Sequence, residues 1–248
     1  MDLGIGGKRA AVAAATAGLG FASARALVDA GARVVVCGRS RERVDAAVAR
    51  LGGGAIGVEC DVSTQGGAAM FVEMAAQRLG GIDILVANGG GPKPGNFASL
   101  KVDDYLPALQ QSLLSVVAMC EAAVPAMRER KWGRVVAITS ISVRQPIANL
   151  MLSNTARAGV TGFLKTLARE VAADGVTVNS VQPGIHATDR ITQLYGAAPD
   201  AGQLGIPAGV VGDPSDFGKV VAFLCGEPAR FITGAHVPVD GGSYAGLL

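Results

Sequence analysis

The chain of 248 residues contains few aromatic residues, histidines and cysteines. Aromatic side chains make up 4% of it, and His occurs twice. The four cysteines, Cys37, Cys60, Cys120 and Cys225, are scattered, with no C-x-x-C pair and no His at ligand spacing. This pattern supports neither a zinc site nor a redox pair. We therefore expect no metal, and free cysteines in a reducing compartment.

Long apolar runs and an excess of charge are also missing. No segment reaches the roughly 18 uninterrupted apolar residues that cross a bilayer, and the N-terminus has no long apolar run behind positive charge. The formal net charge of +2 favours neither nucleic acid nor an acidic surface as a partner. These absences predict a cytoplasmic protein with a small-molecule partner, and no nucleic acid or membrane.

What the chain does contain is short apolar strands that alternate with amphipathic helices. Strands that are apolar on both faces and separated by helices predict an α/β fold, with a doubly wound parallel sheet covered by helices on both sides. The length suits one domain over residues 1–248. The strands are expected at Ala10–Ala13, Arg33–Cys37, Ala55–Glu59, Ile82–Ala87, Arg134–Ile138, Val176–Val181 and His236–Val239.

The stretch Val12–Leu27 has the pattern of a phosphate-binding turn. An apolar strand leads into the small residues of positions 14–20, and an apolar-faced helix follows. Small residues let the backbone approach a pyrophosphate, and the N–H groups and dipole of the helix offset its charge. The alternative is a turn that serves only tight packing.

The end of the second strand indicates which dinucleotide fits. Arg39 and Ser40 follow Gly38, with Arg41 and Arg43 beyond, and no carboxylate stands at this tip. An Arg fork suits a 2′-phosphate, whereas a bare ribose favours an acidic residue. The sequence therefore predicts NADP(H) rather than NAD(H). In the alternative interpretation, Arg39 merely opens a solvated helix.

One long stretch, Ile191–Asp213, lacks clear periodicity and is rich in Gly, Ala and Pro. Such stretches in a compact domain are usually functional. We interpret it as a mobile substrate lid at about residues 189–213.

Together these motifs resemble the short-chain dehydrogenase/reductases over nearly the whole chain, most of all the 3-oxoacyl-acyl-carrier-protein reductases. The motifs are the turn Ala14-x-x-x-Gly18-x-Gly20, Cys60-Asp61-Val62-Ser63, Asp83-Ile84-Leu85-Val86-Ala87-Asn88-Gly89-Gly90, Gly133-Arg134-Val135-Val136 leading to Ser140, Pro183-Gly184 with Thr188, and Ile232-Thr233-Gly234 with Val239-Asp240-Gly241-Gly242. The resemblance implies a single-domain Rossmann fold.

The resemblance also implies roles in cofactor binding. The expected contacts are Thr16, Gly18, Leu19 and Gly20 to the pyrophosphate and adenosine side, Arg39 and Ser40 to the 2′-phosphate, Asp61 and Val62 to adenine, Asn88 and Gly89 to the ribose, and Pro183, Gly184, Ile185 and Thr188 to the nicotinamide end. Ala14 replaces the first glycine of the family's turn, which is tolerable if its φ is negative.

The catalytic positions depart from the family pattern. In the family a Ser polarises the carbonyl, a Tyr four positions before a Lys supplies the proton, and an Asn on the preceding helix holds a water relay. Ser140 matches the first role, and Ser112 stands at the Asn position. Where Y-x-x-x-K is expected, the sequence reads Ser153-Asn154-Thr155-Ala156-Arg157.

Ser153 cannot simply replace a phenol, because an aliphatic hydroxyl is a far weaker acid. Arg157 follows one helical turn later on the same face, so it can bind a ribose hydroxyl and supply positive charge, but it cannot pass a proton. Tyr195, His186, or a water held by Ser140 and Ser153 are the candidate donors. In the plainer alternatives, Tyr195 packs at a subunit contact, the backbone satisfies His186, Ser153 caps a helix and Arg157 is a solvated charge.

We therefore expect an oxidoreductase that reduces a 3-oxoacyl-type or related ketone, or alternatively a nucleotide-binding sensor or oligomer subunit without hydride chemistry. Arg128, Arg130, Lys131 and Arg134 form a charge run where a carrier protein could dock, although such runs are usually solvated turns, and Asp174 argues against docking. The loop Gly89–Gly95 is expected to form a wall of the substrate pocket.

Quaternary structure is implied by the resemblance alone. The helices Asp104–Glu129 and Ser153–Ala173 correspond to the family's dimer faces, and Phe231–Leu248 to its second interface. A homotetramer, or a homodimer, is the expected assembly.

Overall fold

A seven-stranded parallel sheet organises the chain. The computed structural model describes residues 1–189, 191–192 and 200–247. The strands follow the order β3-β2-β1-β4-β5-β6-β7, and every neighbouring pair is parallel. They are β1 (Arg9–Val12), β2 (Arg33–Gly38), β3 (Ile56–Glu59), β4 (Ile84–Ala87), β5 (Gly133–Ile138), β6 (Val176–Pro183) and β7 (His236–Val239).

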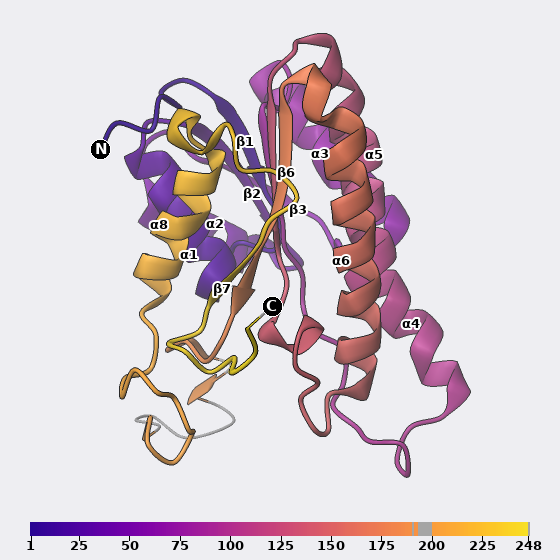
Figure 1. The fold of residues 1–248 in the computed structure, drawn as a ribbon. Helices are drawn as coiled ribbons and strands as arrows, with labels where there is room; N and C mark the ends of the chain where they lie inside the picture. Colours follow the sequence, from indigo (N-terminus) through magenta and orange to yellow (C-terminus); the bar gives the residue numbers. More distant parts are fainter. Residues whose placement is uncertain (190, 193–199, 248) are drawn as a thin grey trace.

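Helices cover both faces of the sheet, as Figure 1 shows. One layer holds α1 (Gly18–Asp29), α2 (Arg41–Leu51) and α8 (Pro214–Cys225); the other holds α3 (Gln65–Leu79), α5 (Ser115–Glu129) and α6 (Met151–Val171). The two apolar cores correspond to these layers, because successive side chains of a strand point to opposite faces. The predicted fold class and the seven strands are confirmed.

The strand order reverses between β1 and β4. The first three strands are added outward from β1, whereas β4 lies on its other side and starts the second half. In open α/β sheets, ligands bind beyond the carboxyl ends of the strands at such a point. The residues after β1, β4, β5 and β6 therefore lie at the expected binding edge.

The long helical stretch before β5 is interrupted. A short helix α4 (Tyr105–Leu109) passes into a π-helical turn, η2 (Gln110–Leu114), before α5 begins. By length and mean hydropathy alone, Val102–Glu129 could cross a membrane. However, 44% of its apolar window is buried within the fold, and α5 packs against α3 and α6, as expected for a core helix with one outer face.

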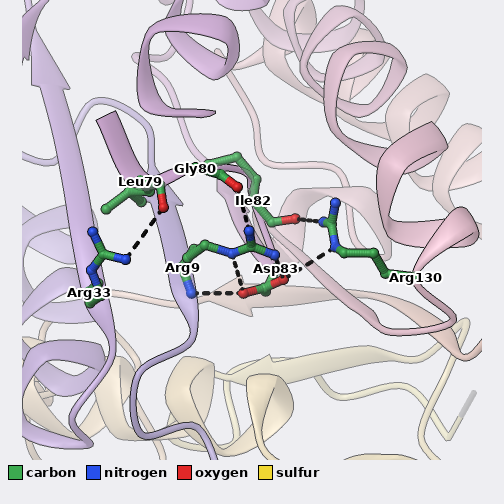
Figure 2. Close-up of polar contacts among 7 residues, drawn as sticks. All are labelled: Arg9, Arg33, Leu79, Gly80, Ile82, Asp83 and Arg130. Atoms are coloured by element: carbon green, nitrogen blue, oxygen red, sulfur yellow. Dashed lines mark hydrogen bonds and ion pairs between the residues drawn. The ribbon is translucent and has the colours of Figure 1, made fainter. Parts of the chain in front are cut away.

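An ion-pair network holds the opposite, N-terminal edge of the sheet (Figure 2). Asp83 accepts hydrogen bonds from the Arg9 backbone N–H at 3.0 Å and from Arg9 Nε and Nη2 at 2.8 and 2.6 Å. Arg130 Nε lies 3.6 Å from the same carboxylate. Burial of Asp83 opposes its ionisation, but the bonds and charge of Arg9 outweigh this and lower the pKa of the carboxyl.

Candidate functional site

The turn between β1 and α1 presents free backbone N–H groups. The residue before α1, Ala17, provides no side-chain cap, and the first turn holds no acidic residue within the described chain. By contrast, Ser40, Thr64 and Asp213 cap α2, α3 and α8 with their side chains. An uncapped helix start facing the switch point suits a bound anion. The predicted residues Thr16, Gly18, Leu19 and Gly20 all lie on this turn or in the first turn of α1.

Close packing explains one glycine of this turn, Gly20, and a positive φ explains another, Gly18. A Cβ on Gly20 would lie 2.6 Å from Asn88 Nδ2 and 2.7 Å from the Ala14 carbonyl oxygen. Gly18 has φ +58°, and a Cβ there would lie 3.7 Å from Thr188 Cγ2. The turn therefore touches both the end of β4 and the segment after β6.

Ala14 adopts a positive φ of 47°. We expected the Ala14 methyl group to be tolerated at a negative φ, and this expectation is wrong. The neighbouring contacts compensate for the strained backbone: its N–H donates to Cys37 Sγ at 3.3 Å, and Asn88 Nδ2 donates to its carbonyl at 3.1 Å. Asn88, expected at the ribose, thus uses its amide to hold the turn.

The tip of β2 carries an unpaired cation. Arg39 is exposed and forms no ion pair within the described residues, while Arg41 pairs with Asp45 at 2.7 Å. Glu59, at the end of β3, was not among the predicted site residues. It pairs with Gly38 of β2 and is exposed. After β3, Asp61 is exposed and accepts from the Ser63 N–H at 2.9 Å, and Val62 is buried.

Ser140 follows β5 and is half-buried. Its Oγ accepts a hydrogen bond from the Ser142 N–H at 3.1 Å. This contact uses an oxygen lone pair, so the hydroxyl hydrogen of Ser140 stays available for another acceptor.

Ser153 and Arg157 lie on α6. The helix begins at Met151 after Leu150, so Ser153 lies inside it, and the alternative of a helix cap is wrong. Arg157 is partly buried and donates Nη1 to the Ile138 carbonyl at 3.2 Å, so the solvated alternative is wrong too. Its guanidinium is thereby held at the end of β5, two residues before Ser140.

Ser112 lies within the π-helical turn and is 5% exposed. Its Oγ has no hydrogen-bond partner among the described residues. The turn packs against α6, and Gln111 lies close to Gly89 after β4. Single π-helical turns occur often at functional sites because they redirect side chains. Nothing in the sequence pattern indicated this turn.

The segment after β6 packs on the C-terminal strand. Gly184 donates its N–H to the Val239 carbonyl at 3.0 Å, and a Cβ on Gly184 would lie 2.8 Å from Asp240 Cα. Pro183 ends β6 beside Val239, and Ile185 accepts from the Gly212 N–H at 3.0 Å. Pro183, Gly184, Ile185 and Thr188 thus lie at the same edge as the turn after β1.

Of the two side chains predicted as candidate proton donors, the structure describes His186. His186 is buried, contacts the Gly184 carbonyl at 3.3 Å through Nδ1, and packs edge-on against Phe217 with ring centroids 5.2 Å apart. Burial lowers the pKa of this imidazole, which favours the neutral ring. This geometry matches the alternative in which the backbone satisfies the His186 ring. Tyr195 lies outside the described residues.

The basic run before β5 is neutralised by distant carboxylates. Arg128 and Lys131 pair with Asp174, and Arg130 with Asp83. Arg134 is 2% exposed, stacks on Trp132 at 4.3 Å and pairs with Glu227 at 3.5 Å. The four cations of this run are therefore paired, and docking of a carrier protein, which Asp174 argued against, stays untested.

The loop after β4 is fastened to the segment before α6. Gly95 donates to the Asn149 carbonyl at 2.7 Å and accepts from the Met151 N–H at 3.3 Å. Lys93 pairs with Asp104 at 2.6 Å. This loop therefore stands as a fixed wall between the end of β4 and the start of α6.

A cavity of about 810 Å³ adjoins the uncapped turn. It runs between α1 and α8 and is lined at one end by Ala17, Gly18 and Thr188. Ser140, Ser153 and Arg157 are not among its described lining residues.

All four cysteines are buried and free, and burial raises the pKa of the Cys37, Cys120 and Cys225 thiols to about 12. Within the described ranges, no group of three or more His, Cys, Asp and Glu residues could hold a metal.

Comparison with known proteins shows which proteins this chain is similar to. A sequence model of the family described as enoyl-(acyl carrier protein) reductase matches residues 13–244. The 3-oxoacyl-[acyl-carrier-protein] reductase FabG of Haemophilus influenzae is 36% identical over 239 residues, 96% of this chain and 98% of that protein. Dehydrogenase/reductase SDR family member 4 of Sus scrofa is 34% identical, over 97% of this chain and 88% of that protein.

The chain belongs to the short-chain dehydrogenase/reductase family.

A solved member of similar fold is L-sorbose reductase from Gluconobacter frateurii, complexed with NADPH and L-sorbose. It has a TM-score of 0.89 and 27% identity, with both chains covered completely. The family places this chain among the oxidoreductases. At the three positions predicted to be catalytic, the chain carries Ser140, Ser153 and Arg157, and their correspondence to the family's Ser, Tyr and Lys stays a prediction.

Proposed function

We propose that this short-chain dehydrogenase/reductase is an NADP(H)-dependent ketoreductase with an atypical proton donor. The observation that carries the proposal is that Ser140 follows β5 while the Arg157 guanidinium is bound to the Ile138 carbonyl at the end of the same strand, on the edge where α1 begins uncapped. A nucleotide-binding turn, the Ser140 hydroxyl and the fixed charge of Arg157 on one edge of the sheet suit hydride transfer to a carbonyl.

The uncapped turn supports nucleotide binding on this chain's own geometry. Thr16, Gly18, Leu19 and Gly20 would hold the pyrophosphate, and the unpaired Arg39 with Ser40 would hold a 2′-phosphate. Asp61, Val62 and Gly89 would line the adenosine and ribose, with Asn88 fixing the turn. Pro183, Gly184, Ile185 and Thr188 would contact the nicotinamide end. NADPH, when bound, supplies the hydride.

Each catalytic side chain then has a role that its chemistry permits. Ser140 donates its free hydrogen to the carbonyl oxygen and polarises it. Arg157 remains charged, so it stabilises the developing negative charge and binds a ribose hydroxyl without passing a proton. Ser153 and Ser112, whose Oγ has no partner in the part of the chain that the structure describes, would hold water near the substrate.

The names of the relatives support the proposed substrate class. The printed names of the relatives include 3-oxoacyl-[acyl-carrier-protein] reductase and L-sorbose reductase. A small ketone or 3-oxoacyl compound is therefore the proposed substrate. The segment at about 189–213, of which residues 190 and 193–199 lie outside the described residues, would act as its lid, and Ala187 donates to the Gly212 carbonyl at 2.9 Å close to its two ends. A cytoplasmic location fits the same assignment.

The second candidate is a nucleotide-binding sensor or oligomer subunit without turnover, favoured by the absence of the phenol at position 153. A steady-state assay of NADPH oxidation against a panel of ketones and 3-oxoacyl thioesters separates the two. The double variant Ser153→Tyr with Arg157→Lys sharpens the test. For an adapted site we expect kcat to fall at least about tenfold in this variant, because the site is built around two different side chains.

A rise in kcat on restoring the Tyr and Lys would instead indicate a degraded site. No turnover by the wild type on any substrate, with NADPH binding intact by titration calorimetry, would favour the sensor. Co-purification with a Tyr-bearing paralogue would favour the oligomer subunit.

A further inference from the structure

His186 places a buried ring between the segment after β6 and the start of α8. Its side chain is 4% exposed and packs edge-on against Phe217, with the ring centroids 5.2 Å apart and the ring planes at 81°. Phe217 is itself fully buried in α8. Aromatic pairs favour this geometry, so the contact fixes the orientation of the His186 ring as well as burying it.

Gly212 lies against the same ring. A Cβ on Gly212 would lie 2.7 Å from His186 Cδ2 and 2.9 Å from its Nε2, so a side chain at position 212 would collide with the ring. The Gly212 N–H donates to the Ile185 carbonyl at 3.0 Å, and the Ala187 N–H donates to the Gly212 carbonyl at 2.9 Å. The glycine therefore lets the backbone pair with both neighbours of His186 while the ring fills the space of a side chain.

The His186 ring is held in its neutral form. Nδ1 lies 3.3 Å from the Gly184 carbonyl oxygen, and a carbonyl only accepts hydrogen bonds, so Nδ1 carries the proton. Burial lowers the pKa of the ring, although the Gly184 carbonyl and the carboxylates of Asp213 and Asp240 favour the charged form. At neutral pH the segment after β6 therefore rests on an uncharged ring.

These contacts connect two parts of the proposed cofactor site. The segment Pro183–Thr188 carries the residues proposed to contact the nicotinamide end, and α1 begins at the turn proposed to hold the pyrophosphate. Helix α8 packs closely on α1, where a Cβ on Gly218 would collide with the Ala22 carbonyl. His186 thus joins the nicotinamide segment to α8, and α8 in turn packs on the helix that starts at the pyrophosphate turn.

The two parts also approach each other at Thr188. The Thr188 N–H donates to the His186 carbonyl at 2.8 Å, and a Cβ on Gly18 would lie 3.7 Å from Thr188 Cγ2. Thr188 therefore faces the pyrophosphate turn. Because Thr188 follows His186 by two residues and is bonded to its carbonyl, a displacement of His186 is expected to displace Thr188 relative to Gly18.

We infer that His186 is a positioning residue, whose ring between Gly212 and Phe217 sets the place of the nicotinamide-contacting segment relative to the pyrophosphate turn. The inference rests on the proposed binding of NADP(H). Without the ring, the segment loses its support on α8, so the nicotinamide part of the cofactor loses its place while the adenosine part keeps its contacts. Hydride transfer is sensitive to such a displacement, because the reacting atoms must be held about 3–3.5 Å apart.

Two ligands distinguish the two parts of the cofactor site without turnover. NADPH spans both parts, whereas adenosine 2′,5′-bisphosphate carries the adenosine and the 2′-phosphate but no nicotinamide. For His186→Ala we expect the Kd for NADPH to rise about tenfold and the Kd for the bisphosphate to stay within about twofold, measured by titration calorimetry. Binding of the bisphosphate also reports that the variant is folded, because a general structural defect would weaken both ligands alike.

Gly212→Ala tests the same contact from its other side. The added methyl group would collide with the His186 ring, so we expect this variant to raise the Kd for NADPH about tenfold as well. In the double variant His186→Ala with Gly212→Ala, the methyl group occupies space that the ring has left. The loss of NADPH affinity should therefore be no greater than in the weaker-binding single variant, whereas two independent defects would add.

The rate of reduction gives a third measurement. With a ketone that the wild type reduces, His186→Ala is expected to lower kcat about 10- to 100-fold at saturating NADPH, because the nicotinamide is displaced from the carbonyl. The KM for the ketone should stay within about threefold, since the loss affects the transition state more than substrate binding.

His236→Ala is the matched control, since His236 is the second histidine of the chain. His236 is half-buried on β7, and its Nδ1 contacts Ser180 Oγ at 2.8 Å, so this variant also loses a ring and a polar contact. His236 begins β7, whereas the Gly184 N–H is bonded to Val239 at the end of that strand. Both Kd values and kcat should therefore match those of the wild type.

The inference fails if His186→Ala binds NADPH or reduces the ketone as the wild type does, if it loses both ligands to the same extent, or if the losses of the single variants add in the double variant. A wild type that binds neither ligand would remove the proposed function, and the role of His186 with it. A wild type that binds NADPH but reduces no ketone would favour the nucleotide-binding sensor, and the two binding tests would still decide the role of His186.

Discussion

Arg39 and Arg157 show at the scale of single residues how surroundings decide what an arginine does. Arg157 is held by the Ile138 carbonyl, which fixes its charge near Ser140. Arg39 is exposed at the tip of β2 with no ion pair in the described residues, so its guanidinium can receive an anion. A planar fork matches the geometry of a phosphate, and its charge does not depend on pH in the working range.

Arg39→Ala is therefore expected to weaken NADPH binding about 10- to 100-fold and to change NADH binding less than threefold, because only NADPH carries the 2′-phosphate. Titration calorimetry with both cofactors measures this difference. Arg169→Ala is the control, since Arg169 is an exposed residue in the last turn of α6. An equal loss for both cofactors would contradict the role of Arg39.

At the scale of elements, the two edges of the sheet have different tasks. The carboxyl edge carries the uncapped start of α1 and Ser140, both with groups left for a ligand, together with the segment after β6. The opposite edge is closed by paired charges: Asp83 with Arg9 and Arg130, and Asp174 with Arg128 and Lys131. The ion pairs that stabilise the fold and the groups that can bind a ligand thus lie at opposite ends of the strands.

Asp83→Asn is expected to lower the free energy of unfolding by about 2 kcal/mol at pH 7, because partly buried Arg9 loses its charged partner. The pKa of Asp83 is lowered in the folded state, so its contribution is complete above its pKa in the unfolded chain and is lost as the pH falls through the folded value. The gap between wild type and variant should therefore be constant from about pH 5 to 8 and narrow progressively below about pH 4.

Urea unfolding at several pH values measures this gap. Asp45→Asn provides the control, because Asp45 pairs with Arg41 on an exposed helix face and should leave stability unchanged. A gap that is as wide at pH 3 as at pH 7 would show that shape, and not charge, explains the effect of Asp83→Asn.

At the scale of the whole molecule, apolar surface remains uncovered. A cavity of about 610 Å³ lies between α5 and α6, lined by Val117, Val124 and Phe163 among others. Phe231, near β7, is 99% exposed. These are the two faces at which family resemblance implies subunit contacts. Exposed apolar patches of this kind are typical of association surfaces.

We expect the wild type to sediment as a homotetramer or homodimer at micromolar concentration, and Val117→Glu to shift it to a smaller species, since a buried unpaired carboxylate opposes association. Analytical ultracentrifugation measures the mass. Met70→Glu, on the exposed face of α3, should keep the wild-type mass. A monomeric wild type would contradict the assignment.

The sequence by itself determined the strands, the parallel sheet and the turn after β1. Burial on both faces demands apolar runs of strand length, and a close backbone approach demands small residues, so both leave local patterns. The boundaries moved by one or two residues: β1 starts at Arg9, β4 starts at Ile84, and β6 runs on to Pro183. Ser140, Ser153 and Arg157 were assigned through the family resemblance, and their catalytic roles stay predictions.

Only the tertiary structure decided the features that depend on distant partners. The basic run is neutralised by Asp83, Asp174 and Glu227, and the amide of Asn88 is taken up by the turn after β1. Neither the positive φ of Ala14 nor the π-helical turn around Ser112 has a local signature, because the surrounding packing imposes both. The same reason applies to Gln182, whose side chain is buried without a hydrogen-bond partner among the described residues. Whether a polar side chain is buried in this way depends on segments that only folding brings together.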